Sequence, residues 1–265
     1  MKNLITANHR PKSTVSETEL RQLIDAQIEN SHALGWAAQD IIVVTNLAVD
    51  LPATVIKAPL NETCLTGSKM FALNHLFTLG LIRENEVWWS HDLDAWQNYW
   101  FEPPDFLDIG LTEYSTPKFN GGSIFLRATA RDMVSAITEH ITAAKAGLEE
   151  PSINSVLRSA QFEQRVTILN STFNVGCSAY DVRHARSHKP ILVSHFHPMG
   201  KAGWRVHNFG DGKVSEGSVC PRLFELLVRR FHRGVPPCRT WPSKRGRVRS
   251  EVPSCKSAEQ KGGAC

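Results

Sequence analysis

A chain of 265 residues with 42% hydrophobic and 21% charged side chains has the composition of a folded globular protein and is long enough to bury a sizeable core. Its six cysteines include no Cys-x-x-Cys pair, which excludes an evident zinc site or disulfide framework. No apolar run approaches the ~18 residues of a membrane span, and the first eleven residues are too short and polar for a signal peptide, so the expected location is cytoplasmic.

The net charge of +4 is concentrated at the C-terminus. Residues 229–265 carry ten Lys and Arg against two Glu, whereas the rest of the chain carries 20 basic against 24 acidic side chains. Residues 232–265 are rich in Pro, Gly, Ser and Arg and have too little apolar content to fold. We therefore expect one domain over residues 1–231 and a disordered tail. A basic tail can bind nucleic acid or an anionic surface, although a solvated end is the simpler interpretation.

The N-terminal part of the chain alternates apolar strands with helices. Ser16 and Glu19 form a capping box, which predicts a helix from that point to about Leu34, with Gly35 as its stop. A second helix is expected over residues 66–81. Strands are predicted over residues 4–7, 40–46, 53–58 and 86–91.

The C-terminal part continues with segments of both kinds. Strands are predicted over residues 108–113, 121–127, 165–170 and 190–195, and helices over residues 130–146, 154–165 and 220–231. The alternation along the chain predicts an α/β fold in which helices cover the faces of a sheet.

Two aspartates, Asp92 and Asp94, follow the predicted strand 86–91. In an extended segment their side chains point to the same side, and adjacent carboxylates repel each other unless a proton or a cation lies between them. The carboxyl ends of strands are also where open α/β sheets bind ligands. The pair therefore predicts a divalent metal site; the alternative is two solvated loop carboxylates.

Two histidines, His195 and His197, end a later apolar strand in the same way. Imidazole combined with carboxylates suits Mn²⁺ or a similar transition ion better than Ca²⁺. Lys201, next to Gly200, would bring a cation to phosphate oxygens. Either histidine is also compatible with a partly buried or loop position, and the sequence leaves open which of them binds metal.

Two weaker signals lie between these strands. Gly121 and Gly122, after Asn120, permit close approach of a ligand to the backbone, although a simple turn explains them equally well. Glu149 and Glu150 precede a predicted helix, where they can interact with the helix dipole or act as a general base on an acceptor hydroxyl.

In their order, these segments resemble the GT-A type nucleotide-sugar glycosyltransferases, in particular the glycogenin and galactosyltransferase group. The shared features are a nucleotide-binding turn at residues 6–9, Lys69 on the following helix, Asp-x-Asp at residues 92–94, Phe-Asn-x-Gly at residues 119–122, an acidic turn at residues 149–154, and a late His followed by Gly and Lys. The chain departs from the family's late His-x-x-Gly-x-x-Lys-Pro-Trp motif and from its usual Asp-Gln in the acidic turn.

The resemblance implies a GT-A, Rossmann-like fold with a mixed, mostly parallel sheet flanked by helices. It implies transfer of a sugar from a nucleotide diphosphate sugar, a UDP-sugar in particular, to a hydroxyl of a carbohydrate, protein or lipid acceptor. The metal, Mn²⁺ or Mg²⁺, would be held by Asp92, Asp94 and His195 or His197. The implied catalytic residues are Asp92, Glu149 and Glu150, and the implied donor-binding residues are Ala7, Asn8, Lys69, Asp92, Asn120, Gly121, Gly122 and Lys201.

Two other functions remain open from the sequence. The same carboxylates and histidines suit a metal-dependent phosphoesterase or nucleotidyltransferase, although residues 4–11 lack the glycine expected in the first loop of a nucleotidyltransferase. The third possibility is a nucleic-acid-binding protein that acts through its basic tail. The sequence decides neither the donor sugar, the acceptor nor the stereochemical outcome.

Overall fold

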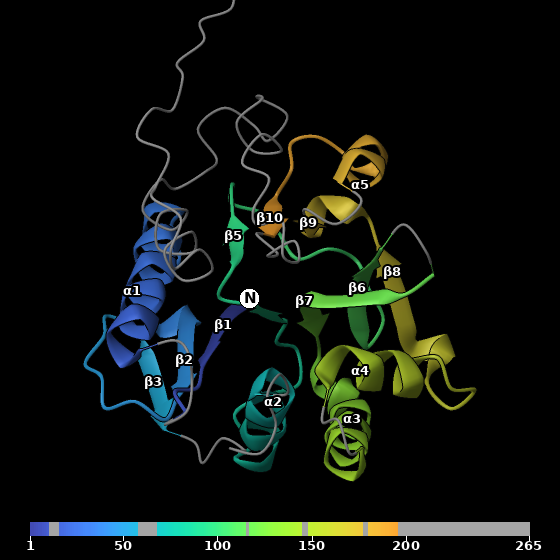
Figure 1. Cartoon of the computed structure of the whole chain (residues 1–265), viewed down its shortest axis with the longest axis horizontal. Coiled ribbons are helices and arrows are strands. Elements are labelled where there is room, and N and C mark those ends of the chain that lie inside the picture. The colour runs from blue at the N-terminus through green and yellow to red at the C-terminus, as the bar shows by residue number, and fades with distance from the viewer. Residues whose placement is uncertain (11–15, 58–67, 115–116, 145–147, 177–179, 196–265) are drawn as a thin grey trace, which may run out of the picture. The chain divides into compact units, whose positions relative to one another are not determined.

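The computed structural model describes residues 1–10, 16–57, 68–114, 117–144, 148–176 and 180–195, whose strands form two sheets (Figure 1). The larger sheet has seven strands in the order β3-β2-β1-β4-β7-β6-β8, and the smaller has three in the order β5-β10-β9. The strands are β1 (Lys2–Ala7), β2 (Ile41–Thr45), β3 (Thr54–Lys57), β4 (Trp88–His91), β5 (Ala95–Gln97), β6 (Ile109–Glu113), β7 (Phe119–Leu126), β8 (Val166–Leu169), β9 (Val175–Gly176) and β10 (Val193–His195).

Helices cover both faces of the larger sheet. Within the described residues, the α-helices are α1 (Glu17–Ala33), α2 (Ser68–Thr78), α3 (Arg131–Ala143), α4 (Glu149–Leu157) and α5 (Tyr180–Arg186). The short 3-10 helices are η1 (Ala38–Asp40), η2 (Ala128–Ala130), η3 (Glu163–Arg165) and η4 (Ser171–Phe173).

The larger sheet is mixed but mostly parallel. Strand β1 lies parallel to β2 on one side and to β4 on the other, β3 is parallel to β2, and β8 is parallel to β6. Strand β7 is antiparallel to both of its neighbours, β4 and β6. The fold class predicted from the sequence is therefore confirmed.

The core has two layers, one on each face of the sheet. Helices α2, α3 and α4 lie together on one side in Figure 1 and bury Met70, Leu73, Met133, Ile137 and Ile153 against the sheet. Helix α1 covers part of the other face with Leu20, Ile24 and Ile28. Strand β2 is buried along its whole length between these layers, which explains its continuous β-branched sequence.

The capping box predicted at Ser16 is present. Its hydroxyl accepts a hydrogen bond from the backbone N–H of Glu19 at 3.2 Å, and its own N–H donates to the Glu19 carboxylate at 2.8 Å. The helix that follows ends before Gly35, which has a positive φ of 93° and so suits glycine.

Helix α4 corrects the prediction that a helix runs from residue 154 to residue 165. It begins at Glu149 and ends at Leu157. Pro151 lies in the first turn, where the backbone N–H groups have no partner within the helix and proline is tolerated. Glu149 and Glu150 are therefore part of the helix rather than of a turn before it.

The sequence patterns also missed short elements. Strands β5 and β9 have only three and two residues, and α5 has seven, so none shows a usable periodicity. The predicted helix 220–231, the tail and the boundary at residue 231 lie outside the described residues.

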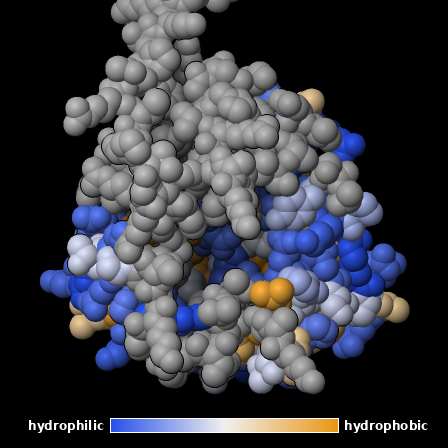
Figure 2. Space-filling view, viewed as in Figure 1, coloured by the Kyte–Doolittle hydropathy of each residue, from blue (hydrophilic) through white to orange (hydrophobic). Residues whose placement is uncertain are grey.

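One face of the molecule shows the polarity of the described surface. Figure 2 shows a face on which hydrophilic residues predominate and hydrophobic ones are scattered. Large apolar side chains that remain exposed include Leu79, Trp100, Leu107 and Ile168. Among the described helices, none has the length and apolar character needed to cross a membrane.

Candidate active site

The two aspartates of the predicted metal site lie where β4 ends and β5 begins. The backbone N–H of Asp92 donates to the carbonyl of Gly122 at 3.0 Å, and the carbonyl of Asp92 accepts from the N–H of Ala95 at 3.0 Å, which closes a tight turn. His91, the last residue of β4, is buried, and its Nδ1 lies 2.9 Å from the Asp92 carbonyl. The turn thus holds both carboxylates at the carboxyl end of the strand.

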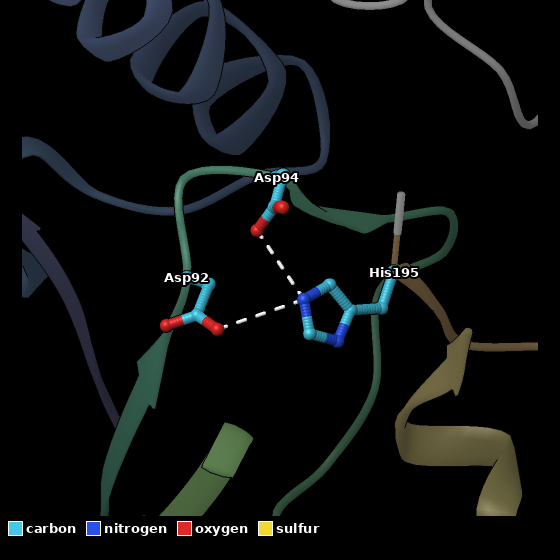
Figure 3. A group of neighbouring side chains, drawn as sticks. All are labelled: Asp92, Asp94 and His195. Atoms are coloured by element: carbon cyan, nitrogen blue, oxygen red, sulfur yellow. Dashed lines mark ion pairs between the residues drawn. The ribbon is translucent and has the colours of Figure 1, made fainter. Parts of the chain in front are cut away.

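His195 joins this pair from the smaller sheet. Strand β10 runs antiparallel to β5, with His195 opposite Ala95, so its imidazole lies beside the turn. Nε2 of His195 is 3.2 Å from Oδ1 of Asp94 and 3.5 Å from Oδ2 of Asp92, and Figure 3 shows the three side chains pointing toward one another. Ligand atoms of the three residues all lie within 4.8 Å of one another.

These three residues fit a divalent metal ion. Two carboxylate oxygens and one imidazole nitrogen form a donor set suited to Mn²⁺ and similar transition ions. The histidine is fully buried, whereas Asp92 is 37% exposed in its side chain, so the cluster opens on the side of that carboxylate. His197, the other candidate metal ligand, and Lys201, which was predicted to contact the donor phosphates, lie outside the described residues.

Lys69 lies against Asp92 and is not solvated. Its Nζ is 2.6 Å from Oδ1 of Asp92 and 3.2 Å from Oε1 of Glu149, and it also donates to the carbonyl of Gly121. The three N–H groups of the ammonium therefore have three acceptors in the protein. In this arrangement Lys69 neutralises carboxylates of the site; its binding of the donor, which the resemblance implies, stays a prediction.

The buried charges around Lys69 shift each other's ionisation. Burial alone would lower the pKa of Lys69, but the carboxylates of Asp92 and Glu149 outweigh that effect and raise it above its ordinary value. Burial raises the pKa of the Glu149 carboxyl to about 7, and the nearby charge of Asp92 acts in the same direction while Lys69 opposes it.

The two predicted catalytic glutamates face different surroundings. Glu149 is buried beside Lys69, close to the metal cluster. Glu150 instead accepts a hydrogen bond from the Tyr114 hydroxyl at 2.6 Å and pairs with Lys118 Nζ at 2.6 Å. Among the described residues, Glu149 contacts Lys69, which also contacts Asp92, whereas Glu150 contacts Tyr114 and Lys118.

The predicted Asn-Gly-Gly segment packs against the imidazole of His195. The side chain of Asn120 is fully buried, and its Oδ1 accepts from the N–H of Gly122 at 2.8 Å. A Cβ atom at Gly122 would lie 2.0 Å from Cε1 of His195. Glycine is therefore required here by the close approach of the imidazole, and not by a turn.

The turn after β1 contains polar side-chain atoms that have no hydrogen-bond partner among the described residues. Ala7 is buried, and both polar atoms of the Asn8 side chain are buried without a hydrogen-bond partner among the described residues. The backbone of the next residue is fixed, since His9 N–H donates to Asn46 Oδ1 at 2.8 Å and its carbonyl accepts from Asn46 Nδ2 at 2.7 Å. This turn lies at the carboxyl end of β1, next to β4.

Two residues that position the cluster have no signal in the sequence. His91 fixes the backbone of Asp92, and Asn174 lies with its Oδ1 3.0 Å from Nδ1 of His195. The second contact joins residues 21 positions apart through a pairing of very short strands. A residue pattern along the chain does not reveal such a contact.

Comparison with known proteins supports the fold. No protein-family model and no curated protein sequence matches the chain. The structure is similar to the galactosyltransferase LgtC in complex with donor and acceptor sugar analogs, with a TM-score of 0.50, 14% identity, and coverage of 85% of this chain and 100% of LgtC. An active-site mutant of LgtC gives a TM-score of 0.52 at 13% identity, covering 86% of this chain and 95% of that one.

The bifunctional glycosyltransferase WbbM, solved in its apo form, is similar over 86% of this chain and 51% of its own, with a TM-score of 0.54 and 11% identity. Because these identities are low, the similarity shows only that the helices and strands are arranged in the same way. The mixed, mostly parallel sheet of seven strands with helices on its faces agrees with these structures. The chain has the fold of the GT-A glycosyltransferases.

Proposed function

We propose that this protein is a metal-dependent glycosyltransferase that moves a sugar from a nucleotide diphosphate sugar, a UDP-sugar in particular, to an acceptor hydroxyl. The observation that carries the proposal is the convergence of Asp92, Asp94 and His195 at the carboxyl end of β4 in a GT-A fold. Ligands of open α/β sheets bind at this edge.

The proposed metal would be held by Asp92, Asp94 and His195, where it would neutralise the charge that develops on a diphosphate leaving group. Asp92 and Glu149 share the ammonium of Lys69, a buried cation that lies against both carboxylates. We infer that Lys69 orients Asp92 for its ligand, because its Nζ lies 2.6 Å from Oδ1 of that carboxylate.

The proposed site of the nucleotide base is the turn after β1. An amide side chain offers an NH₂ group that donates and a carbonyl oxygen that accepts, which matches the imide edge of uracil, where an N–H lies between carbonyl oxygens. Asn8 has both groups buried and unpaired among the described residues, and an unpaired buried polar group costs free energy that a bound ligand would relieve. This match supports a uridine diphosphate donor.

We assign Glu149, rather than Glu150, to the reaction centre. Glu149 lies next to Lys69, which contacts Asp92, whereas the carboxylate of Glu150 is engaged by Tyr114 and Lys118. A carboxylate within reach of the acceptor hydroxyl is the group that an inverting reaction needs as its base. The anomeric configuration of the product tests this role, because an inverting reaction needs such a base.

The acceptor class is proposed as a carbohydrate, with protein and lipid hydroxyls as alternatives. The similar structure of LgtC was solved with donor and acceptor sugar analogs, which supports a sugar in this position. Binding of nucleic acid or an anionic surface through residues 229–265 stays a prediction, since those residues lie outside the described part of the chain.

The test is the thermal stability of the protein with Mn²⁺ and a panel of nucleotide diphosphates and sugar nucleotides. We expect Mn²⁺ with UDP to raise the melting temperature of the wild type but not of Asp94→Asn. The matched control is Asp132→Asn, which removes a half-exposed carboxylate that pairs with Arg165 away from the cluster, and this variant should respond like the wild type.

Turnover is then measured as release of UDP from UDP-sugars, with and without candidate acceptors. Release that requires Mn²⁺ and disappears in Asp94→Asn supports the proposal. If no nucleotide diphosphate stabilises the wild type in the presence of Mn²⁺, the glycosyltransferase proposal is wrong.

A further inference from the structure

We propose that Asn174 is a positioning residue, which orients the imidazole of His195 so that Nδ1 carries the proton and Nε2 is presented to the metal. The inference rests on the proposed function, because it takes His195 as a metal ligand. It adds a residue that no pattern in the sequence indicates and that itself contacts neither the metal cluster's carboxylates nor the proposed donor site.

The hydrogen bond between the two side chains determines which ring nitrogen is available. Oδ1 of Asn174 lies 3.0 Å from Nδ1 of His195, and the opposite nitrogen, Nε2, lies 3.2 Å from Asp94 Oδ1. With the amide oxygen of Asn174 facing the ring, Nδ1 is the donor, because a carbonyl oxygen only accepts hydrogen bonds. In a neutral imidazole Nε2 then has the lone pair, as a metal ligand requires.

The contact between Asn174 and His195 is shielded from water, which strengthens the preference for the proton on Nδ1. The side chains of Asn174 and His195 are both fully buried. Water cannot replace the amide as the acceptor for Nδ1, and a hydrogen bond in such surroundings is stronger than one in contact with solvent. Loss of the amide oxygen would therefore leave the buried Nδ1–H without its acceptor, which is unfavourable.

The backbone of Asn174 is fixed on both sides. Its N–H donates to the carbonyl of Ser171 at 2.9 Å, which closes η4, and its own carbonyl accepts a hydrogen bond from the buried Arg183 guanidinium. The next residues form β9, which pairs in parallel with β10 and places Gly176 opposite His195. The imidazole is thus held by β10, and the amide by the position directly before the adjacent strand β9.

The ring of His195 has little freedom to adopt another orientation. On one side a Cβ atom at Gly122 would lie 2.0 Å from its Cε1, so the backbone of β7 is in close contact with the ring. Asn174 then provides the directional contact, since packing against glycine does not distinguish between the two nitrogens. A neutral amide also fixes the ring without adding a third negative charge beside Asp92 and Asp94.

Two substitutions of Asn174 distinguish a role in orienting His195 from a role in filling space beside it. Asn174→Asp keeps an oxygen acceptor for Nδ1–H, whereas Asn174→Leu has a similar size and no acceptor. Binding of Mn²⁺ alone is measured by electron paramagnetic resonance of the free ion, on the full chain. We expect Asn174→Leu to bind Mn²⁺ about 10- to 100-fold more weakly than the wild type and Asn174→Asp to bind at least as tightly.

A second measurement uses the wild type, so that it does not depend on the folding of a variant. The protein labelled with ¹⁵N in histidine is loaded with Zn²⁺ as a diamagnetic probe, and His195 is assigned by comparison with His195→Gln. We expect a protonated Nδ1 and a metal-bound Nε2. A reversed amide, with Nδ2 of Asn174 donating to Nδ1, would give the opposite pattern and overturn the inference.

The outcomes distinguish this inference from the proposed function. If the wild type binds Mn²⁺ and Asn174→Leu binds it equally tightly, or Asn174→Asp is as weak as Asn174→Leu, the positioning role is wrong and the metal site stands. If the wild type binds neither Mn²⁺ nor Zn²⁺, the proposed metal site and the role of Asn174 are wrong together.

Discussion

Lys69 forms a buried ion pair with Asp92, with 2.6 Å between Nζ and Oδ1. The same ammonium reaches Glu149 at 3.2 Å, so one cation joins the turn after β4 to the first turn of α4. Lys69 and Glu149 are almost completely buried, and Asp92 is partly exposed. The lysine therefore connects the candidate metal centre to the protein interior, and its removal should affect both.

Replacing Lys69 with methionine should destabilise the protein by about 3–5 kcal/mol, because the substitution leaves Glu149 as a buried carboxylate without its cation. The free energy of unfolding in urea at pH 8 measures the effect. The double variant Lys69→Met with Glu149→Gln should recover much of the loss, since the uncompensated charge is then absent.

The control for this prediction is Lys118→Met. Lys118 pairs with Glu150 at 2.6 Å, but its side chain is 50% exposed, and such pairs contribute about 0–1 kcal/mol. An equal loss of stability in the two single variants would show that burial of the Lys69 pair has no special energetic role.

The sequence predicted those parts of the site that depend on neighbours along the chain. The capping box at Ser16 follows from local spacing and is present. Asp92 and Asp94 do follow β4, but a tight turn closed by Ala95, and not the extended backbone assumed from the sequence, brings them together. His195 was one of two candidate histidines. Its place in the cluster follows from the pairing of β10 with β5, which has only three residues and no visible alternation.

The role of Lys69 was beyond prediction for a similar reason. In the sequence it is a single lysine early in a helix, with no nearby partner. Its contacts with Asp92, Gly121 and Glu149 bring together segments that are far apart in the chain, and burial of the lysine depends on all of them. Tertiary contacts of this kind determine whether a lysine is solvated or neutralises buried carboxylates.

The stability contributed by Glu149 should decrease as the pH rises. Burial raises its pKa from 4.5 to about 7, so between these values the folded state holds the proton and the unfolded chain releases it. The contribution is fully present below about pH 4.5 and is lost as the pH rises through about 7.

Glu149→Gln has no proton to release at this position. Its free energy of unfolding, relative to the wild type, should therefore rise across this window by up to about 3 kcal/mol. Urea unfolding of both proteins at half-unit steps from pH 4.5 to pH 8 checks the prediction. A difference that stays constant, or that falls with pH, would contradict it.

Alanine substitutions at Gly121 and Gly122 form a matched pair that tests the geometry of the metal cluster. An alanine Cβ at position 122 would lie 2.0 Å from Cε1 of His195, whereas one at position 121 would lie 3.1 Å from Cδ1 of Ile153 and 3.4 Å from a carboxylate oxygen of Glu149. Gly122→Ala should displace the imidazole and abolish the rise in melting temperature with Mn²⁺. Gly121→Ala should keep that rise, at a stability cost of about 1–3 kcal/mol for the tighter packing.

The measurement for this pair is the melting temperature with and without Mn²⁺, after circular dichroism has established that both variants are folded. If Gly122→Ala responds to Mn²⁺ as strongly as Gly121→Ala does, then the imidazole of His195 is not required in its observed position. The cluster would in that case bind metal through its aspartates alone.

Asn8→Ala should weaken binding of UDP while leaving binding of Mn²⁺ unchanged. Both polar atoms of the Asn8 side chain are buried and unpaired among the described residues, and the turn is held by Asn46 independently of that side chain. Loss of two hydrogen bonds to a base corresponds to about tenfold weaker binding or more. Calorimetric titration of the variant and the wild type with UDP in Mn²⁺ measures it.

Inorganic pyrophosphate is the control ligand, because it contains the diphosphate and lacks the base. Its affinity should be the same for Asn8→Ala and the wild type, since the carboxylates and the imidazole of the metal cluster are untouched. Equal losses for UDP and pyrophosphate would mean that Asn8 shapes the diphosphate site and does not contact the base. A loss for UDP alone would place the base at the end of β1, where the sheet brings that turn beside the Asp92 strand.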